Sequence, residues 1–286
     1  MRDRLAAYFD EWAGIGLLVP EYYLLYAVAV VLGMYLAVRE AERDGLNPVS
    51  VFRAGLVIVA AAMVGARLFV VAQYWGYYRL HLSELMKIWE GGTASTGAYV
   101  GGLLAAFGAA AWYRLPTARF FDCCAPAAAM AIVLGRIGCF LNGCCYGSRS
   151  GLPWAVSFPA GAGPYHDHME AGLISAGQAA LPVHPTQLYE AFYGLGIFVL
   201  LLLLKRAQKE DGTLTAFLFL AYSFGRFFNE FLRGDERGAV GFFSAPQLLA
   251  LVMILASGSF FVARRTRMRG EANILCQPSE QRNSIS

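Results

Sequence analysis

Seven long apolar runs constrain what this 286-residue chain can fold into. A run of about 20 apolar residues is long enough to cross a bilayer as a helix. Short polar links join most of the runs, which predicts a single helical bundle domain over residues 1–263. The predicted fold class is therefore all-α, a polytopic membrane protein with about seven transmembrane helices. The runs cover 22–38, 54–75, 97–113, 121–142, 187–204, 214–232 and 245–263.

The charge content agrees with a membrane protein. Only 15% of the residues are charged, whereas a soluble domain usually carries about a quarter. The net charge of +3 is small and scattered, so no nucleic-acid partner is expected. Residues 1–20 lack the basic-then-apolar layout of a signal peptide and are expected to lie along the membrane surface as an interfacial segment.

The distribution of lysine and arginine predicts the orientation, because cytoplasmic links carry an excess of both. With the N-terminus outside, thirteen of these residues fall inside and seven outside. The count favours an outside N-terminus and a cytoplasmic C-terminus. Residues 264–286 are then a polar cytoplasmic tail, expected to be disordered.

Three arginines, Arg67, Arg136 and Arg226, fall within the apolar runs. An arginine at membrane depth costs about 2.5 kcal/mol or more, so it is expected to pair with a carboxylate or a ligand anion. Glu230 lies four residues after Arg226 and shares its helix face, and Glu190 is a second embedded carboxylate. One interpretation is an internal salt-bridge network. The other is surplus positive charge that the phosphate of a lipid headgroup would satisfy.

Two polar stretches flank the runs. "GGTASTGAYVGG" (91–102) is glycine-rich, and its backbone amides could hold an anion. Gly97 and Gly101 also form a small-xxx-small pattern, which favours a helix-packing role for both. "HPTQLYEA" (184–191) gathers His, Gln, Tyr and Glu at the start of a span. A lone histidine before a span is typical of the membrane–water interface. The cluster of four polar residues favours a functional site instead.

Three cysteines lie in "GRIGCFLNGCCYG" (135–147), at the end of a span. A turn at Asn142–Gly143 would let Cys139 meet Cys144 or Cys145. A disulfide, which an oxidising compartment permits, and a free-thiol polar site both stay open.

Two more cysteines, Cys123 and Cys124, begin the same span. They lie about 30 Å from Cys144 at 1.5 Å per helical residue, so a four-cysteine metal site is excluded. Both are interpreted as small buried apolar residues. No metal ligand and no cofactor are expected.

Several stretches resemble signature sequences of one bacterial family. "GRIGCFLNGCCYG" follows the pattern G-R-x-G-N-F-x-N-G-E-x-x-G, and "HPTQLYEA" is close to H-P-S-Q-L-Y-E-A. Supporting matches are "YYLLYAVAVVLGMYLAVREA" (22–41), "GRFFNEFLRGD" (225–235) and "SAPQLLALVMI" (244–254). Over roughly residues 20 to 263 the chain resembles the prolipoprotein diacylglyceryl transferases.

The resemblance implies a seven-span transferase in the bacterial cytoplasmic membrane, with its active site toward the outer leaflet. It would transfer the diacylglyceryl group of phosphatidylglycerol to the lipobox cysteine thiol of a preprolipoprotein signal peptide, releasing glycerol phosphate. One alternative is a related transferase with a different acceptor. The other is a non-catalytic protein that binds or translocates lipid within the bilayer.

The resemblance also implies roles for individual residues. Arg136 and Arg226 would hold the headgroup phosphate, Glu230 would orient Arg226, and Tyr22 occupies the position of an important tyrosine. Further residues expected around the substrate are Arg67, Thr96, Gly97, Cys139, Asn142, Gly143, Cys144, Gly147, His184, Gln187, Tyr189, Glu190 and Arg233.

Three of these positions depart from the family pattern. Cys139 and Cys144 stand where the family has an asparagine and a glutamate, and Thr96 stands where it has a histidine. Threonine cannot act as a base at neutral pH, so thiol deprotonation would rely on another group. A nearby arginine can lower a cysteine pKa from ~8.5 to between about 3.5 and 7.5. We interpret Cys139 and Cys144 as wall residues of the headgroup site rather than metal ligands or covalent intermediates.

Overall fold

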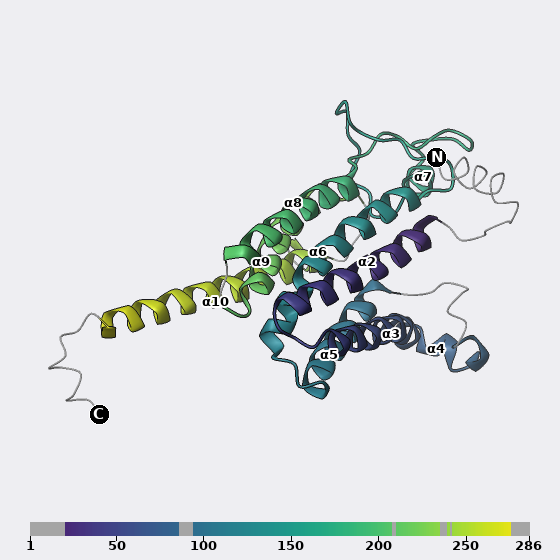
Figure 1. The fold of residues 1–286 in the computed structure, drawn as a ribbon. Coiled ribbons are helices and arrows are strands. Elements are labelled where there is room, and N and C mark those ends of the chain that lie inside the picture. The colour runs from purple at the N-terminus through teal and green to yellow at the C-terminus, as the bar shows by residue number, and fades with distance from the viewer. Residues whose placement is uncertain (1–20, 86–93, 208–209, 235–238, 241, 276–286) are drawn as a thin grey trace, which may run out of the picture. The chain divides into compact units, whose positions relative to one another are not determined.

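The structure is a computed structural model that describes residues 21–85, 94–207, 210–234, 239–240 and 242–275 (Figure 1). Nearly all of the regular structure is helical. The helices are α2 (Glu21–Arg43), α3 (Pro48–Gln73), α4 (Trp75–Tyr78), the 3-10 helix η1 (Leu82–Glu84), α5 (Ser95–Trp112), α6 (Thr117–Asn142), α7 (Gly163–Glu170), α8 (Thr186–Ala207), α9 (Thr213–Glu230) and α10 (Ala245–Leu275). Two short strands, β1 (Ala239–Val240) and β2 (Phe243–Ser244), form an antiparallel pair.

Each of the seven apolar runs forms a helix, namely α2, α3, α5, α6, α8, α9 and α10. Among the described residues, five of these helices are long and apolar enough to cross a membrane, and α5 is apolar but shorter. The 18-residue α9 carries buried charged side chains. The all-α, multi-pass membrane class is therefore confirmed. The count of seven spans and the outside N-terminus stay predictions.

The chain divides into two compact units. The smaller unit is Tyr26–Ala131, and the larger unit combines Met1–Leu25 with Ile132–Ser286. That both belong to one bundle over residues 1–263 stays a prediction. The interfacial role of residues 1–20 lies outside the described residues.

Close packing of α3 against α5 defines the smaller unit. A Cβ atom on Gly97 would overlap the carbonyl of Gly65, and one on Gly101 would lie 2.5 Å from the carbonyl oxygen of Ala61. Small residues let two helix backbones approach this closely in a membrane. The predicted packing role of Gly97 and Gly101 is therefore confirmed.

The core of the smaller unit includes Cys123, which is fully buried. Its thiol donates to the carbonyl oxygen of Ala37 at 3.0 Å. Cys124 packs beside this core and is half-buried. The interpretation of both as apolar packing residues is confirmed.

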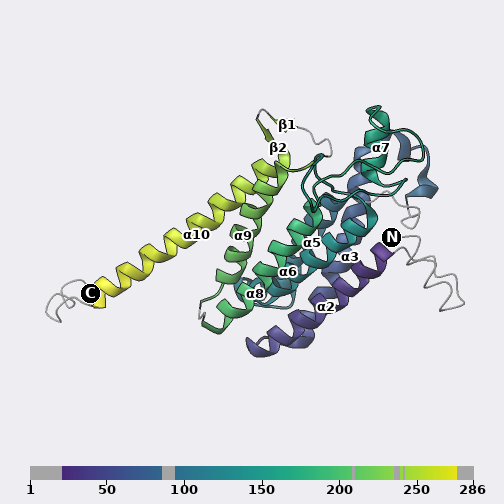
Figure 2. The same ribbon diagram turned by 90° about the horizontal axis from the view of Figure 1, so that it is seen from above.

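The larger unit places α8, α9 and α10 side by side, with α9 packed against both neighbours (Figure 2). Residues 132–142 of α6 belong to it as well. The connection between α6 and α8 carries α7 and its own small core. That core contains Tyr146, Phe158, Ala180 and Val183.

Helix α10 continues past Arg264 to Leu275, so the predicted tail begins as a helix rather than as a disordered segment. The extension is anchored at its start, because Arg264 hydrogen-bonds to Thr213 and pairs with Glu210. Residues 276–286, the rest of the predicted tail, lie outside the described residues.

Candidate active site

A buried ion pair joins α6 to α8 in the larger unit. The guanidinium of Arg136 lies 2.8 Å from Oε1 of Glu190, which is completely buried. The hydroxyl of Tyr222 donates to the same oxygen at 2.7 Å, and Nδ2 of Asn229 donates to Oε2 at 3.2 Å. Three donors from α6 and α9 thus hold one carboxylate on α8, and that carboxylate fixes the orientation of Arg136.

A second ion pair lies within α9. The guanidinium of Arg226 lies 2.6 Å from Oε2 of Glu230, as their four-residue spacing predicts. The hydroxyl of Ser244 donates to the other Glu230 oxygen at 3.0 Å. The backbone amide of Ser244 donates to Oε1 of Gln247 at 2.9 Å, which ties this network to the start of α10.

Tyr193 of α8 lies within electrostatic range of both Arg136 and Arg226. Its hydroxyl is buried and has no hydrogen-bond partner among the described residues. Its ring packs on Gly225, where an added Cβ would lie 2.9 Å from a ring carbon. The glycine directly before Arg226 therefore makes room for the ring of Tyr193.

Gly147 is the point where three polar segments of the larger unit meet: the cysteine loop after α6, the segment that begins α8, and the segment that follows α9. Its amide donates to the carbonyl of His184 at 2.9 Å, and it forms an isolated β-bridge with Arg233. A Cβ on Gly147 would lie 2.5 Å from Cβ of His184 and 2.7 Å from the carbonyl oxygen of Leu232. This position therefore needs a glycine for the loop to pack against the start of α8 and the end of α9.

The start of α8 holds the cysteine loop through its polar side chains. Thr186 donates to the carbonyl of Cys145 at 2.9 Å, and Nε2 of Gln187 donates to the carbonyl of Cys144 at 2.7 Å. Both side chains are buried. The predicted substrate-binding residue Gln187 therefore supports the loop through Nε2, and its buried Oε1 has no hydrogen-bond partner among the described residues.

His184 and Tyr189 lie nearer the surface of this cluster. Nδ1 of His184 lies 3.3 Å from the hydroxyl of Tyr189, and the indole N–H of Trp154 donates to that hydroxyl at 2.8 Å. The histidine therefore belongs to an aromatic hydrogen-bonded group.

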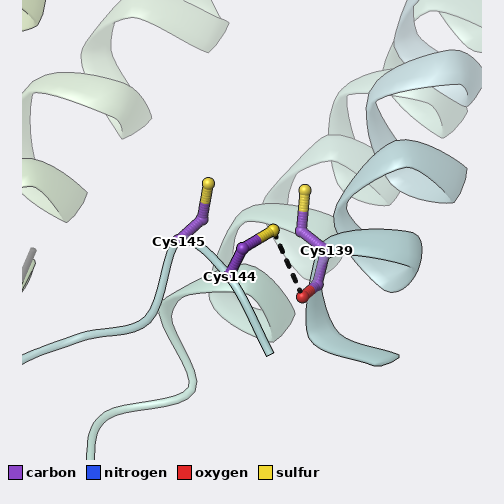
Figure 3. A group of neighbouring side chains, drawn as sticks. All are labelled: Cys139, Cys144 and Cys145. Atoms are coloured by element: carbon purple, nitrogen blue, oxygen red, sulfur yellow. Dashed lines mark hydrogen bonds between the residues drawn. The ribbon is translucent and has the colours of Figure 1, made fainter. Parts of the chain in front are cut away.

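The three cysteines of the loop come together (Figure 3). The sulfur atoms of Cys139, Cys144 and Cys145 all lie within 4.8 Å of one another, and none of the three is in a disulfide. Helix α6 persists through Cys139, and Gly143 follows with a φ of 71°. The predicted turn therefore exists and allows the predicted meeting. Cys139 is buried, and the other two are half-buried.

Hydrogen bonds around Cys145 favour its thiolate form, and the charge of Arg233 adds to this effect. Hydrogen bonds with the thiols of Cys139 and Cys144, together with the guanidinium of Arg233, hold the pKa of Cys145 well below its ordinary value, although burial opposes the shift. The predicted site residue Arg233 therefore lies beside the cysteine group. Asn142 is exposed at the end of α6, within hydrogen-bonding range of Cys144.

Three predicted site residues belong to the smaller unit, and a fourth, Tyr22, is only partly described. Arg67 is buried in the smaller unit, where its Nε donates to the carbonyl of Leu85 at 3.1 Å and its guanidinium also bonds to the carbonyl of Glu84. Thr96 is exposed at the start of α5, and Gly97 packs against α3. Tyr22 begins α2, but its side chain lies outside the described residues.

Several polar residues of the site were not predicted from the sequence. They are Tyr193, Tyr222, Asn229, Thr186, Ser244 and Gln247. Tyr222 and Asn229 lie four residues before and three after Arg226, so helical spacing from that arginine would have found both.

Known proteins similar to this chain agree with the motif resemblance. Residues 12–263 match the family model for prolipoprotein diacylglyceryl transferase. A phosphatidylglycerol–prolipoprotein diacylglyceryl transferase from Thermosynechococcus vestitus is 35% identical over 253 residues, which cover 87% of this chain and 90% of the relative. Proteins of the same name from Clostridioides difficile and Streptococcus pyogenes are 29% and 32% identical, and the matches cover 84% and 89% of this chain and 88% and 93% of those relatives. This chain therefore belongs to the prolipoprotein diacylglyceryl transferase family.

Proposed function

We propose that this protein transfers the diacylglyceryl group of phosphatidylglycerol to the lipobox cysteine thiol of preprolipoproteins, releasing glycerol phosphate. The names of its relatives specify this donor and this class of acceptor. The reaction takes place in the bacterial cytoplasmic membrane, with the site toward the outer leaflet. The excess of basic residues on the opposite side supports that orientation.

The paired arginines of the larger unit carry this proposal. Each pairing with a carboxylate occupies only part of a guanidinium that has five N–H donors. The side chains of Arg136 and Arg226 keep 16% and 10% of their surface exposed. Two oriented, partly open guanidiniums suit the oxygen atoms of a phosphodiester. The buried hydroxyl of Tyr193, in electrostatic range of both arginines, is a further donor for the same anion.

The geometry also supports the chemistry of transfer. The acceptor sulfur attacks the glycerol carbon, a C–S bond forms, and the C–O bond to phosphate breaks. The electron pair of that bond passes to the phosphate oxygen, where negative charge accumulates. Donors that are already fixed by Glu190 and Glu230 stabilise this charge without reorganising during the reaction.

A non-catalytic lipid-binding protein would use the same arginines, so activity in cells separates the two functions. The gene is expressed in bacteria depleted of their own transferase, and lipoprotein modification is followed by mass spectrometry. We expect the wild-type chain to restore lipoprotein modification. The variant Arg206→Ala, which changes an exposed arginine at the end of α8, should restore it as well. Arg136→Ala is expected to fail at equal expression. Failure of the wild-type chain would favour one of the two alternatives, a transferase with a different acceptor or a protein that binds lipid without catalysis.

A further inference from the structure

We propose that Cys139, Cys144 and Cys145 together bind one Zn²⁺ ion, whose open coordination position takes the lipobox thiol of the acceptor and holds it as a thiolate. This inference rests on the proposed transferase function and assigns the acceptor side of the same site. It replaces the interpretation of Cys139 and Cys144 as wall residues.

The spacing of the three sulfur atoms fits zinc. Tetrahedral zinc with Zn–S bonds of about 2.3 Å places its sulfur ligands about 3.8 Å apart. The sulfurs of Cys139, Cys144 and Cys145 lie within 4.8 Å of one another, so each pair needs to close by about 1 Å at most. Figure 3 shows the three side chains next to one another, with Cys144 turned toward Cys139.

Backbone contacts hold the loop in this arrangement. The amide of Cys144 donates to the carbonyl of Cys139 at 3.1 Å, and Gln187 and Thr186 hold the next two carbonyls. Cys145 has a φ of 62°, in the left-handed region that non-glycine residues rarely adopt. Such backbone conformations occur at sites where a side chain must be aimed. The thiol of Cys144 also donates to the carbonyl oxygen of Cys139 at 3.7 Å, a contact that it would give up on binding zinc. The backbone contacts and the two side chains of α8 do not use the sulfur atoms, so they would hold the loop with the metal bound.

The number of ligands leaves room for a substrate. Among the described residues, the group of potential metal ligands contains these three thiols and no fourth His, Cys, Asp or Glu. Three protein ligands with a fourth position for water or substrate are typical of catalytic zinc, whereas structural zinc has four. Cys144 and Cys145 are half-buried, so the acceptor thiol can reach the three cysteines.

Electrostatics favours zinc over a monovalent soft metal. Three thiolates and Zn²⁺ carry a net charge of −1, which the guanidinium of Arg233 beside Cys145 can balance. Copper(I), which also suits thiolates, would leave −2 before the acceptor thiolate binds and −3 afterwards, whereas zinc carries −1 and −2 in the same two states. Arg136 lies within electrostatic range of Cys139 and Cys145 as well. With or without the acceptor thiolate, the divalent ion leaves one negative charge fewer to be balanced than copper(I) does.

The proposed reaction needs a means of ionising the acceptor thiol. Glu190 and Glu230 are both engaged by arginines, and Thr96 cannot accept the proton. A thiol that coordinates zinc loses its proton outright. On binding, the acceptor therefore releases one proton to water, and its sulfur then forms the C–S bond as the C–O bond breaks toward phosphate. The thioether product carries no charge and leaves the metal, which undergoes no change of oxidation state.

Metal content and spectroscopy test the site directly. The full chain is purified in nanodiscs containing phosphatidylglycerol, supplied with ZnCl₂, and its metals are counted by inductively coupled plasma mass spectrometry. We expect one zinc per chain in the unmodified protein and in Cys124→Ser, a matched cysteine change elsewhere in α6. The triple variant Cys139→Ser, Cys144→Ser, Cys145→Ser should bind none. With Co²⁺ in place of zinc, a lipobox peptide with cysteine should shift the visible bands, and the serine peptide should not.

Four results of the binding, mass-spectrometry and cobalt experiments would overturn the proposal. They are less than a tenth of an equivalent of zinc in the unmodified protein, stoichiometric copper instead of zinc, a disulfide among the three cysteines found by mass spectrometry, or cobalt bands that ignore the cysteine peptide. The triple variant can misfold, so two experiments use the wild-type chain. One is the cobalt spectroscopy, and the other measures glycerol phosphate release after a chelator has removed the zinc. Glycerol phosphate release at the full rate after zinc removal would refute the zinc site and leave the transferase function. Peptide-responsive metal without any release would refute the transferase function instead.

Discussion

Replacing Glu190 by glutamine should destabilise the protein strongly, because the change leaves the charged Arg136, whose side chain is only 16% exposed, without its counter-ion. Glu190 is completely buried and lies 2.8 Å from the guanidinium. Removing one partner of such a pair costs about 3–5 kcal/mol. The midpoint of thermal unfolding changes by about 2–4 °C per kcal/mol in domains of about 150–250 residues, which predicts a fall of about 6–20 °C.

A double-mutant cycle isolates the pair from other effects of the substitution. Glu190→Gln and Arg136→Gln are measured singly and together in the same detergent, by tryptophan fluorescence during heating. The double variant leaves no unpaired charge, so it should be more stable than the sum of the single changes by about 3 kcal/mol.

A surface pair provides the control. Glu210 is 51% exposed and pairs with Arg264, so Glu210→Gln should cost at most about 1 kcal/mol. Additive effects at Glu190 and Arg136, or a Glu190→Gln variant as stable as the Glu210→Gln control, would refute a buried ion pair that positions Arg136.

Three further predictions address the loop and the topology. Gly147→Ala should destabilise the protein by about 1–3 kcal/mol, since its Cβ would press on two backbone segments. Gly151→Ala has open space and should be neutral, and equal melting curves for the two variants would argue against the packing of this loop. His168 is buried, and burial and Arg149 lower its pKa from 6.5. Its neutral form is therefore favoured in the folded state, and stability should fall as the pH drops below about 6.5. Proteolytic cleavage within residues 143–185 should become faster below about pH 6.5. A cleavage rate that does not depend on pH would show that protonation of His168 does not destabilise this segment. A cysteine placed at Ala160 should react with an impermeant reagent from outside the cell and one at Glu210 should not, and the reverse pattern would invert the orientation.

The helices were predictable from the sequence because each depends on a local property. A run of about 20 apolar residues predicts a helix whatever its neighbours are. The Arg226–Glu230 pair and the packing of Gly97 and Gly101 follow in the same way from spacing within one helix. The helical start of the tail was not predicted, because the composition after Arg264 resembles a disordered end, whereas α10 continues to Leu275 and Arg264 bonds to Thr213.

The partners of the other arginines depend on which helices meet, and a single sequence does not contain that information. Arg136 finds its carboxylate 54 residues away on α8, and Asn229 reaches the same carboxylate from α9. Arg67 was expected to pair with a carboxylate or a ligand anion. The described contacts include hydrogen bonds from its guanidinium to backbone carbonyls 17 and 18 residues away, which no pattern in the sequence indicates.

The transfer reaction, reconstituted from purified components, tests the central claim most directly. Protein in nanodiscs with phosphatidylglycerol is mixed with a lipobox peptide, and both released glycerol phosphate and thioether-linked peptide are counted. We predict equal amounts of both products, no reaction with the serine peptide, and a loss of about 100-fold or more in Arg136→Ala and Arg226→Ala. The Arg206→Ala control should keep the full rate. A folded, lipid-loaded protein that releases no glycerol phosphate, or arginine variants at the full rate, would contradict the account.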